Sequence, residues 1–316
     1  MLDPLRCLGD GRWDWADPRQ AYVNLYLEGT TLRGRAGGIP GLGAGIAAWA
    51  RAQGWQVELQ TDPLGYGLVT ASLVDLWVDP QVGEVESNRA TQARWGTGIR
   101  IWERQGDWLL GQLADDGYCG WLKGVGVAAI SEQEFQALLQ AQRRILPKSS
   151  QLGKHWLWAG TAIPLWNRDA ELEPLATALP PPPACGPAQV IQTARRFLPT
   201  GDEAVSDYLW GGTAGSRMDC SGFVQTVGRL CGRVLPRDAD QQAQACQPLD
   251  WHALKPGDLM FFGEREITHV GIALGAGAVI HCSRFHNGVR IDPIGDPETA
   301  YGAKLRRLFR GGGRWF

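Results

Sequence analysis

Hydrophobic and polar positions change their period along the chain, and each change predicts a different kind of unit. Residues 21–36 (AYVNLYLEGTTLRGRA) alternate apolar and polar side chains, which predicts one strand. Residues 41–54 form a short helical pattern between glycines, and residues 55–60 return to the strand pattern. The sequence therefore predicts a small mixed α/β unit over residues 1–62, to which it assigns no chemistry.

The next stretch has the pattern of an all-β unit. Residues 66–80 (YGLVTASLVDLWVDP) predict one strand, and residues 96–123 predict three short strands separated by QGD and DDG turns at hairpin spacing. The segment RQGDWLLGQLADDGYCGWL resembles bacterial SH3-like domains, in which such strands close a small barrel. We expect an SH3-like domain over residues 63–130.

A helix and a linker are expected between this domain and the last one. Residues 131–146 have apolar side chains at helical spacing, with Ser131 and Glu134 placed as a capping box. The following HWLWAGTAIPLW suggests strands of a shortened second SH3-like unit, and LPPPPACGP (179–187) is a stiff extended tract typical of a linker. These features define a third segment, residues 131–180.

The C-terminal segment, residues 181–316, has helices first and strands after. AQVIQTARRFLPT and CSGFVQTVGRLCG have helical periodicity, whereas GDLMFFG, HVGIALG and AVIHCSR are short apolar strands. This order predicts an α+β domain.

Composition and charge exclude several classes of function. The 316 residues carry 31 basic and 33 acidic side chains, and a net charge of −2 without a basic face argues against nucleic-acid binding. No run of 18 apolar residues predicts a membrane span, and the first twenty residues do not have the pattern of a signal peptide. Seven cysteines without regular spacing favour free thiols in a reducing compartment.

Cys220 is the first candidate for chemistry. The glycine-rich stretch before it cannot be helical throughout, and the apolar residues after it have helical spacing, so Cys220 is expected at the first turn of a helix. Unpaired N–H groups and the helix dipole favour negative charge there, which would lower the pKa of the thiol.

Two of the five histidines are placed to act on this thiol. His269 begins the strand pattern HVGIALG and His281 lies at the end of the next strand, across a tight glycine-containing turn. Antiparallel pairing of these strands would bring the two imidazoles together, so that one can orient the other.

The motifs DCSGFVQ, LKPGDLMFF, THVGIAL and VIHCSR, in this order, resemble the NlpC-type cell-wall cysteine peptidases, which have a papain-like fold. The resemblance implies that Cys220 is the nucleophile, His269 the base and His281 its orienting partner. It implies no cofactor and no metal. A zinc site formed by His281, Cys282 and His286 has a spacing that matches no standard site. The other thiols of this segment, Cys231, Cys246 and Cys282, are expected to be structural.

A narrower group within this family carries SH3-like domains and cleaves γ-D-glutamyl-L-diamino acid bonds of murein peptides. Resemblance to this group implies that the phenol of Tyr208 supports the oxyanion. It also implies that Tyr118 of the SH3-like domain closes the site beyond L-Ala, so that only stems with a free amine enter. The remaining residues that match its substrate-binding positions are Trp210, Asp219, Ser221 and Asp238.

One position departs from the pattern of this group. Where the group carries a glutamate, the stretch SNRATQ has Asn88, and either Glu84 or Glu86 could replace that acid after a register shift. A solvated acidic turn is the alternative for both glutamates.

The sequence therefore predicts an endopeptidase for murein stem peptides with a free N-terminal L-Ala, acting in cytoplasmic cell-wall recycling. A secreted or periplasmic lysin of the same chemistry, an amidase or acyltransferase on the same core, and a noncatalytic wall-binding protein are the alternatives. Intact Cys220, His269 and His281 argue against the last of these.

Overall fold

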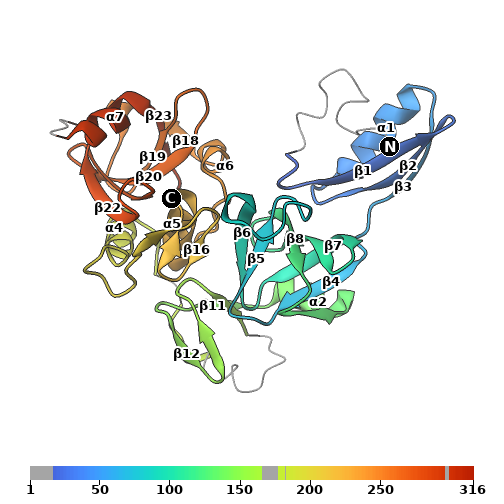
Figure 1. The fold of residues 1–316 in the computed structure, drawn as a ribbon, viewed down its shortest axis with the longest axis horizontal. Coiled ribbons are helices and arrows are strands. Elements are labelled where there is room, and N and C mark those ends of the chain that lie inside the picture. Colours follow the sequence, from blue (N-terminus) through green and yellow to red (C-terminus); the bar gives the residue numbers. More distant parts are fainter. Residues whose placement is uncertain (1–16, 166–176, 182, 296–298) are drawn as a thin grey trace.

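The computed structural model describes residues 17–165, 177–181, 183–295 and 299–316. Figure 1 shows an N-terminal sheet with one helix, a central β unit, a small two-hairpin region and a C-terminal α+β domain. The end of the segment predicted to form a shortened second SH3-like unit, from residue 166 on, lies outside the described residues. Residue 182 of the proline-rich linker also lies outside them.

The N-terminal unit is a three-stranded sheet packed against one helix (Figure 1). The helix α1 (Leu42–Ala52) buries Leu42, Ile46 and Ala50, which lie on one of its faces. The single strand predicted over residues 21–36 is wrong, because Gly29, with φ +60°, closes a turn that splits it into two paired strands. The strands are β1 (Tyr22–Glu28), β2 (Thr31–Gly37) and β3 (Gln56–Gln60), and β3 runs parallel to β2.

The central unit is a seven-stranded antiparallel sheet around an apolar core that includes Val69, Leu76 and Leu122. The three strands expected over residues 96–123 are confirmed, but the stretch 66–80 forms two strands at separate places in the sheet. In sheet order the strands are β10 (Val127–Ile130), β4 (Gly65–Val69), β7 (Gly98–Gln105), β8 (Trp108–Leu113), β9 (Cys119–Lys123), β5 (Leu73–Trp77) and β6 (Arg89–Arg94).

A helix and two short hairpins follow. The capping box at the start of α2 (Glu132–Gln140) is confirmed, since Ser131 Oγ accepts from the Glu134 backbone and Glu134 Oε2 accepts from the Ser131 backbone. The helix is shorter than the predicted 131–146. After it, β11 (Arg143–Ile145) pairs with β14 (Ala162–Pro164), and β12 (Ser150–Leu152) pairs with β13 (His155–Leu157).

The C-terminal domain has the predicted α+β order. A six-stranded antiparallel sheet packs against α5 (Cys220–Leu230), whose residues are all buried. The sheet runs β18 (Gln247–Leu249), β23 (Phe309–Arg314), β19 (Leu259–Phe262), β20 (His269–Gly275), β21 (Ala278–Ser283), β22 (Gly288–Pro293). The other elements are α4 (Pro187–Arg195), β15 (Asp207–Tyr208), β16 (Thr213–Ala214), β17 (Arg217–Met218), α6 (Ala239–Gln244), η3 (Trp251–Ala253) and α7 (Ala300–Leu308).

Buried ion pairs hold the central unit against α5. Asp115 accepts hydrogen bonds from Arg229 of α5 at 2.8 Å and from Arg143 at 2.7 Å. Burial alone would raise the pKa of Asp115, but the two guanidinium groups outweigh it and lower the pKa to about 2. On the same interface, Arg94 of β6 donates to the Thr213 carbonyl and the Thr226 hydroxyl. Strand β6 therefore lies beside β16 and α5, the helix whose first residue is the candidate nucleophile.

Within the described residues, no helix is long and apolar enough to cross a membrane.

Candidate active site

Cys220 is the first residue of α5, as the sequence predicts. The helix starts there because Asp219 is its N-cap, with Oδ1 accepting from the backbone N–H of Gly222 at 2.7 Å. A side chain at Gly222 would collide with the carbonyl oxygen of Gly212, so glycine allows the preceding loop to cross close to the helix start. The six cysteines in the described part of the chain are free.

Strands β20 and β21 bring the two predicted histidines into contact. His269 Nε2 and His281 Nδ1 are 2.6 Å apart. The predicted pairing across the glycine turn is therefore confirmed. His281 is fully buried, and its other nitrogen, Nε2, lies 2.8 Å from Oδ2 of Asp292 on β22.

Asp292 is a site residue that sequence reasoning missed. It is buried, and both of its carboxylate oxygens also lie within hydrogen-bond distance of His286 Nε2, at 2.9 and 3.2 Å. Burial alone would raise the pKa of Asp292, but its contacts with His281 and His286 outweigh this and lower the pKa. The sequence signal was an acid in the alternating strand pattern of GVRIDP.

These contacts assign the proton positions along the chain of side chains. An ionised Asp292 only accepts hydrogen bonds, so His281 carries its proton on Nε2. Burial lowers the pKa of His281 and holds that of His269 well below 6.5, so both rings are neutral. His281 Nδ1 therefore accepts from Nε2 of His269, which leaves Nδ1 of His269 as the free basic nitrogen.

The resting state of the thiol differs from the expectation. Burial, reinforced by the charge of Asp219, raises the pKa of Cys220 to about 12. The backbone N–H of Val270, the residue after His269, acts in the opposite direction but is outweighed. The expected lowering by the helix start is thus overcome by desolvation. The thiol of Cys220 and the imidazole of His269 are both neutral at rest, so the thiol proton must move during attack.

Replacing Asp292 by alanine is expected to lower kcat by roughly 10- to 100-fold with KM nearly unchanged, because His281 loses the acceptor that fixes its tautomer. Asp292→Asn tests the charge at similar volume. Steady-state kinetics with a pH profile would measure both variants, with the exposed Asp250→Asn as the matched control. An Asp292→Ala protein with wild-type kcat would contradict this role.

The same group of side chains could also be considered as a metal site. One ligand atom each of His281, His286 and Asp292 lies within 4.8 Å of the others. The nitrogen-to-oxygen distances of 2.8 and 2.9 Å are those of hydrogen bonds, and His281 Nε2 carries the proton shared with Asp292. Cys282, the third member of the zinc site considered above, instead donates to the Met218 carbonyl at 3.1 Å. The donor set thus fits a proton chain and not a cation.

A pocket of about 250 Å³ opens over Cys220. Its walls come from the central unit, from the loop before α5 and from the start of α6. The candidate residues of the sequence that line it are Tyr118, Tyr208, Trp210, Asp219, Cys220, Ser221 and Asp238. The structure therefore brings together residues separated by more than one hundred positions, while His269 and His281 lie on strands β20 and β21, which pack against α5.

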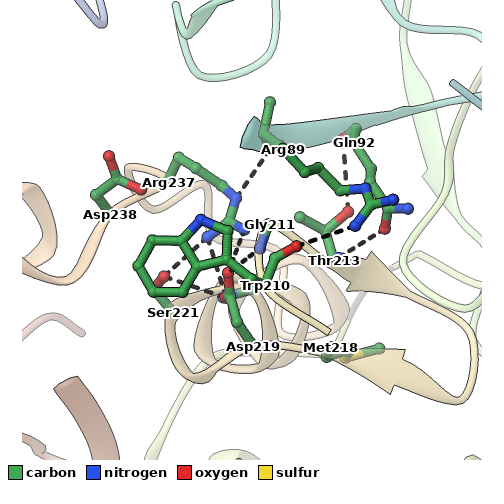
Figure 2. Close-up of polar contacts among 12 residues, drawn as sticks. Arg89, Gln92, Trp210, Gly211, Thr213, Met218, Asp219, Ser221, Arg237 and Asp238 are labelled. Atoms are coloured by element: carbon green, nitrogen blue, oxygen red, sulfur yellow. Dashed lines mark hydrogen bonds and ion pairs between the residues drawn. The ribbon is translucent and has the colours of Figure 1, made fainter. Parts of the chain in front are cut away.

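Asp219 and Ser221 line the pocket, but their polar atoms have partners within the chain. Arg237, which is fully buried, donates to Asp219 Oδ2 at 2.7 Å and to Ser221 Oγ at 2.8 Å (Figure 2). Asp219 also accepts from the backbone N–H groups of Gly211 and Gly222. Its carboxylate therefore shapes the start of α5 and is not open to a substrate amine.

Arg237 and the strand β6 also fix the loop that carries Trp210. Arg237 Nε donates to Thr91 of β6 at 2.8 Å, and Arg89 donates to the Trp210 carbonyl at 3.4 Å (Figure 2). Trp210 itself is 47% exposed. Its indole is thus a pocket wall that remains accessible to a ligand.

Tyr208 and Tyr118 are both pocket phenols held in the protonated form. Burial, with the nearby charge of Asp219, raises the pKa of Tyr208. Burial and the charge of Asp238 raise the pKa of Tyr118. Each is therefore an O–H donor, and Tyr118 donates to Asp238 Oδ2 at 3.0 Å.

The acids proposed to replace the missing glutamate do not line the pocket. Asn88 is buried, and its amide holds a loop by donating to the carbonyls of Asp79 and Gly83 at 2.7 Å. Glu84 pairs with Lys123, and Glu86 lies 3.7 Å from Arg284. The register-shift interpretation is therefore wrong.

Acids from elsewhere supply the negative charge of the pocket. Asp238 and Asp240, at the start of α6, line it together with Arg19 from the segment before β1. Arg19 was missed because the sequence assigned no chemistry to residues 1–62, and Asp240 was missed although it lies two residues after the candidate Asp238.

Comparison with known proteins bears on both the C-terminal and the central units. Residues 205–303 match the NlpC/P60 family, and residues 84–124 match the bacterial dipeptidyl-peptidase SH3 domain. These matches confirm the two resemblances predicted from the motifs.

Two relatives are similar over most of their length. The chain is 28% identical over 247 residues to a γ-D-glutamyl-L-lysine dipeptidyl-peptidase of Bacillus subtilis (strain 168), covering 69% of this chain and 81% of the relative. It is 26% identical over 270 residues to the protein of the same name from Bacillus cereus (strain ATCC 10987 / NRS 248), covering 71% and 78%. The crystal structure of an NlpC/P60 family protein from Bacillus cereus ATCC 10987 has a TM-score of 0.63 at 20% identity, covers 79% of this chain and 99% of its own, and thus shares the fold.

Proposed function

We propose that this chain, a cysteine peptidase with an NlpC/P60 domain behind a bacterial SH3-like domain, hydrolyses γ-D-glutamyl-L-diamino acid bonds of murein stem peptides. The observation that carries the proposal is one pocket in which Cys220, at a helix start, faces Tyr118 and Asp238. The hydrogen-bonded residues His269, His281 and Asp292 lie on the strands of the sheet that packs against α5, and they supply a base of fixed tautomer.

The reaction begins with attack of the Cys220 thiol on the γ-carbonyl of D-Glu. His269 Nδ1 takes the thiol proton as the carbon–sulfur bond forms, because both groups are neutral at rest. The Cys220 backbone N–H and the Tyr208 hydroxyl stabilise the oxyanion. His269 then gives its proton to the leaving amine of the diamino acid, and a thioester to Cys220 remains.

Water completes the cycle. His269, again neutral, takes a proton from water as it attacks the thioester, and the Cys220 thiol leaves with a proton.

The carboxylate of Asp238 at one end of the pocket explains why substrates with a free L-Ala amine would be selected. Asp238 is a carboxylate whose Oδ2 accepts from Tyr118 and from Arg19, and its side chain also forms a capping box with Gln241 at the start of α6. A substrate ammonium beside Asp238 would form a charge-assisted hydrogen bond in a partly desolvated place. An acylated nitrogen has no charge to offer there.

Product analysis by mass spectrometry tests this proposal. L-Ala-γ-D-Glu-L-Lys is expected to yield L-Ala-γ-D-Glu and lysine, because the named relatives act on a γ-D-glutamyl-L-lysine bond. The N-acetylated peptide is expected to be cleaved at least roughly tenfold more slowly, since it lacks the ammonium. Failure of the wild type to release the dipeptide would refute the cleavage. Equal rates for the two peptides would refute only the amine selection.

The α-linked isomer of the same peptide is the matched control for the bond. It has the same composition and charge, but its scissile carbonyl is displaced from the thiol when the L-Ala amine is bound at Asp238. Rapid cleavage of the α-linked isomer would point to a general peptidase.

We also place the enzyme in cytoplasmic cell-wall recycling. Stem peptides with a free L-Ala amine are those already detached from the glycan, which supports a role after wall breakdown. Fractionation of the native producing cells tests this, and recovery of the protein from the medium would favour the secreted alternative.

A further inference from the structure

Arg19 ends the substrate pocket on the side of Asp238, and it comes from the segment that leads into the N-terminal unit. Its Nη1 donates to Asp238 Oδ2 and to Asp240 Oδ1, each at 2.9 Å. Its Nη2 donates to Asp240 Oδ2 at 2.7 Å and to Asp17 Oδ2 at 2.8 Å, and its Nε donates to Asp17. All five N–H groups of a guanidinium are thereby used by three carboxylates.

The backbone around Arg19 is tied to both of the other walls. The carbonyl of Arg19 accepts from the backbone N–H of Cys119, next to Tyr118, at 2.6 Å. Asp17 Oδ2 also accepts from the Gln241 amide of α6 at 2.8 Å. The segment therefore joins the central unit to the peptidase domain, and Arg19 is held by contacts on both sides.

Arg19 also separates two spaces. An open groove of about 670 Å³ lies next to the catalytic pocket, and Arg19, Asp240 and Ile267 line both. The groove is otherwise lined by Ala243, Gln244, Arg265, Glu266 and Arg310. Without the Arg19–Asp240 pair, the catalytic pocket would continue into this groove.

We propose that Arg19 is a specificity-determining residue. Its ion pairs with Asp238 and Asp240 form a wall of the pocket next to the free amino-terminal residue of the bound peptide, so that a peptide extended beyond this residue does not fit. This inference rests on the proposed function and gives the N-terminal segment a role in it. A group attached to the L-Ala nitrogen beside Asp238 would meet the guanidinium 2.9 Å from that carboxylate. Arg19 does not itself bind an anion, because no N–H is left for one.

The wall does not repel the substrate amine. Three carboxylates (Asp17, Asp238 and Asp240) surround one guanidinium, so the group keeps a net charge of about −2 when all four are ionised. An ammonium is therefore still attracted to this end of the pocket. The selection against extended or acylated peptides is steric, and the attraction of the free amine is electrostatic.

The test compares kcat/KM for L-Ala-γ-D-Glu-L-Lys and its N-acetyl form in Arg19→Ala. We expect the ratio of kcat/KM for the acetylated peptide to kcat/KM for the free peptide to rise at least roughly tenfold. Asp240→Asn, which loosens the wall without touching the Tyr118–Asp238 bond, should raise the ratio as well. Arg310→Ala, which changes only the outer groove, is the matched control and should leave the ratio unchanged.

Arg19→Lys keeps the charge but cannot bridge three carboxylates, so an intermediate ratio is expected, and this variant serves if Arg19→Ala does not fold. An unchanged ratio in Arg19→Ala or Arg19→Lys and in Asp240→Asn, with free-peptide activity retained, would overturn the inference. Calorimetric binding of L-Ala-γ-D-Glu and its N-acetyl form gives the same comparison without turnover. A wild type that binds the free dipeptide but cleaves neither peptide would refute the proposed function alone.

Discussion

The Cys220→Ala protein is expected to lose hydrolysis of L-Ala-γ-D-Glu-L-Lys, with kcat/KM lowered by roughly 10⁴-fold or more. Alanine removes the only group that forms the covalent bond, and no other thiol lines the pocket within the described residues. Fold and stability should change little, because the substitution removes one sulfur atom at a pocket wall. Steady-state hydrolysis and a thermal melt would measure both effects.

Cys231→Ala is the matched control for this variant. Cys231 is the C-cap residue of the same helix and is only 2% exposed. Its sulfur lies 3.7 Å from Thr193 Oγ1. Its loss should lower stability modestly and leave kcat/KM close to wild type. Similar losses of activity in the two variants would mean that Cys220 packs and does not react.

Replacing His269 by alanine is expected to lower kcat/KM by roughly 10³-fold. The substitution removes the base that takes the thiol proton, and a thiol whose pKa is about 12 gives almost no thiolate unaided at neutral pH. The exposed His252→Ala is the control, since it removes an imidazole that lies on η3 and does not line the pocket, and it should keep wild-type activity. Retention of most activity by His269→Ala would show that another group is the base.

The pH dependence of hydrolysis follows from the pKa of His269. Burial holds the pKa of His269 well below 6.5, so the base is neutral and competent throughout the neutral range. Activity should be flat near neutral pH and fall only as pH drops through that lowered pKa, when the imidazole takes a proton. In His269→Ala the acid limb due to this imidazole should disappear. A limb centred at or above pH 6.5 in the wild type would contradict the neutral resting pair.

Local patterns allowed prediction of the parts of the site that depend on neighbours in sequence. Cys220 was placed at a helix start because a glycine-rich stretch gives way to helical spacing, and β20 and β21 were paired because a tight glycine turn joins them. His269 and His281 then meet as a consequence of antiparallel register. The α+β order of the last domain follows from the same periodicities.

The parts that escaped prediction depend on contacts between distant segments. Arg19 meets Asp238 across 219 positions, and nothing in the short-range pattern around Arg19 indicates where its unit packs. Asp219 was expected to face substrate, but Arg237 and two backbone N–H groups occupy its carboxylate. The thiol pKa was also misjudged, because burial depends on the assembled pocket whereas the helix start can be predicted from sequence.

The central claim is that Cys220 forms a thioester with the γ-carbonyl of D-Glu. The most direct test is rapid acid quenching of the wild type with L-Ala-γ-D-Glu-L-Lys, followed by mass spectrometry of the intact protein and of its peptides. We predict an L-Ala-γ-D-Glu acyl group on the peptide that contains Cys220, and none in the Cys220→Ala protein. An acyl group mapped to another side chain, or undiminished turnover by Cys220→Ala, would contradict the account.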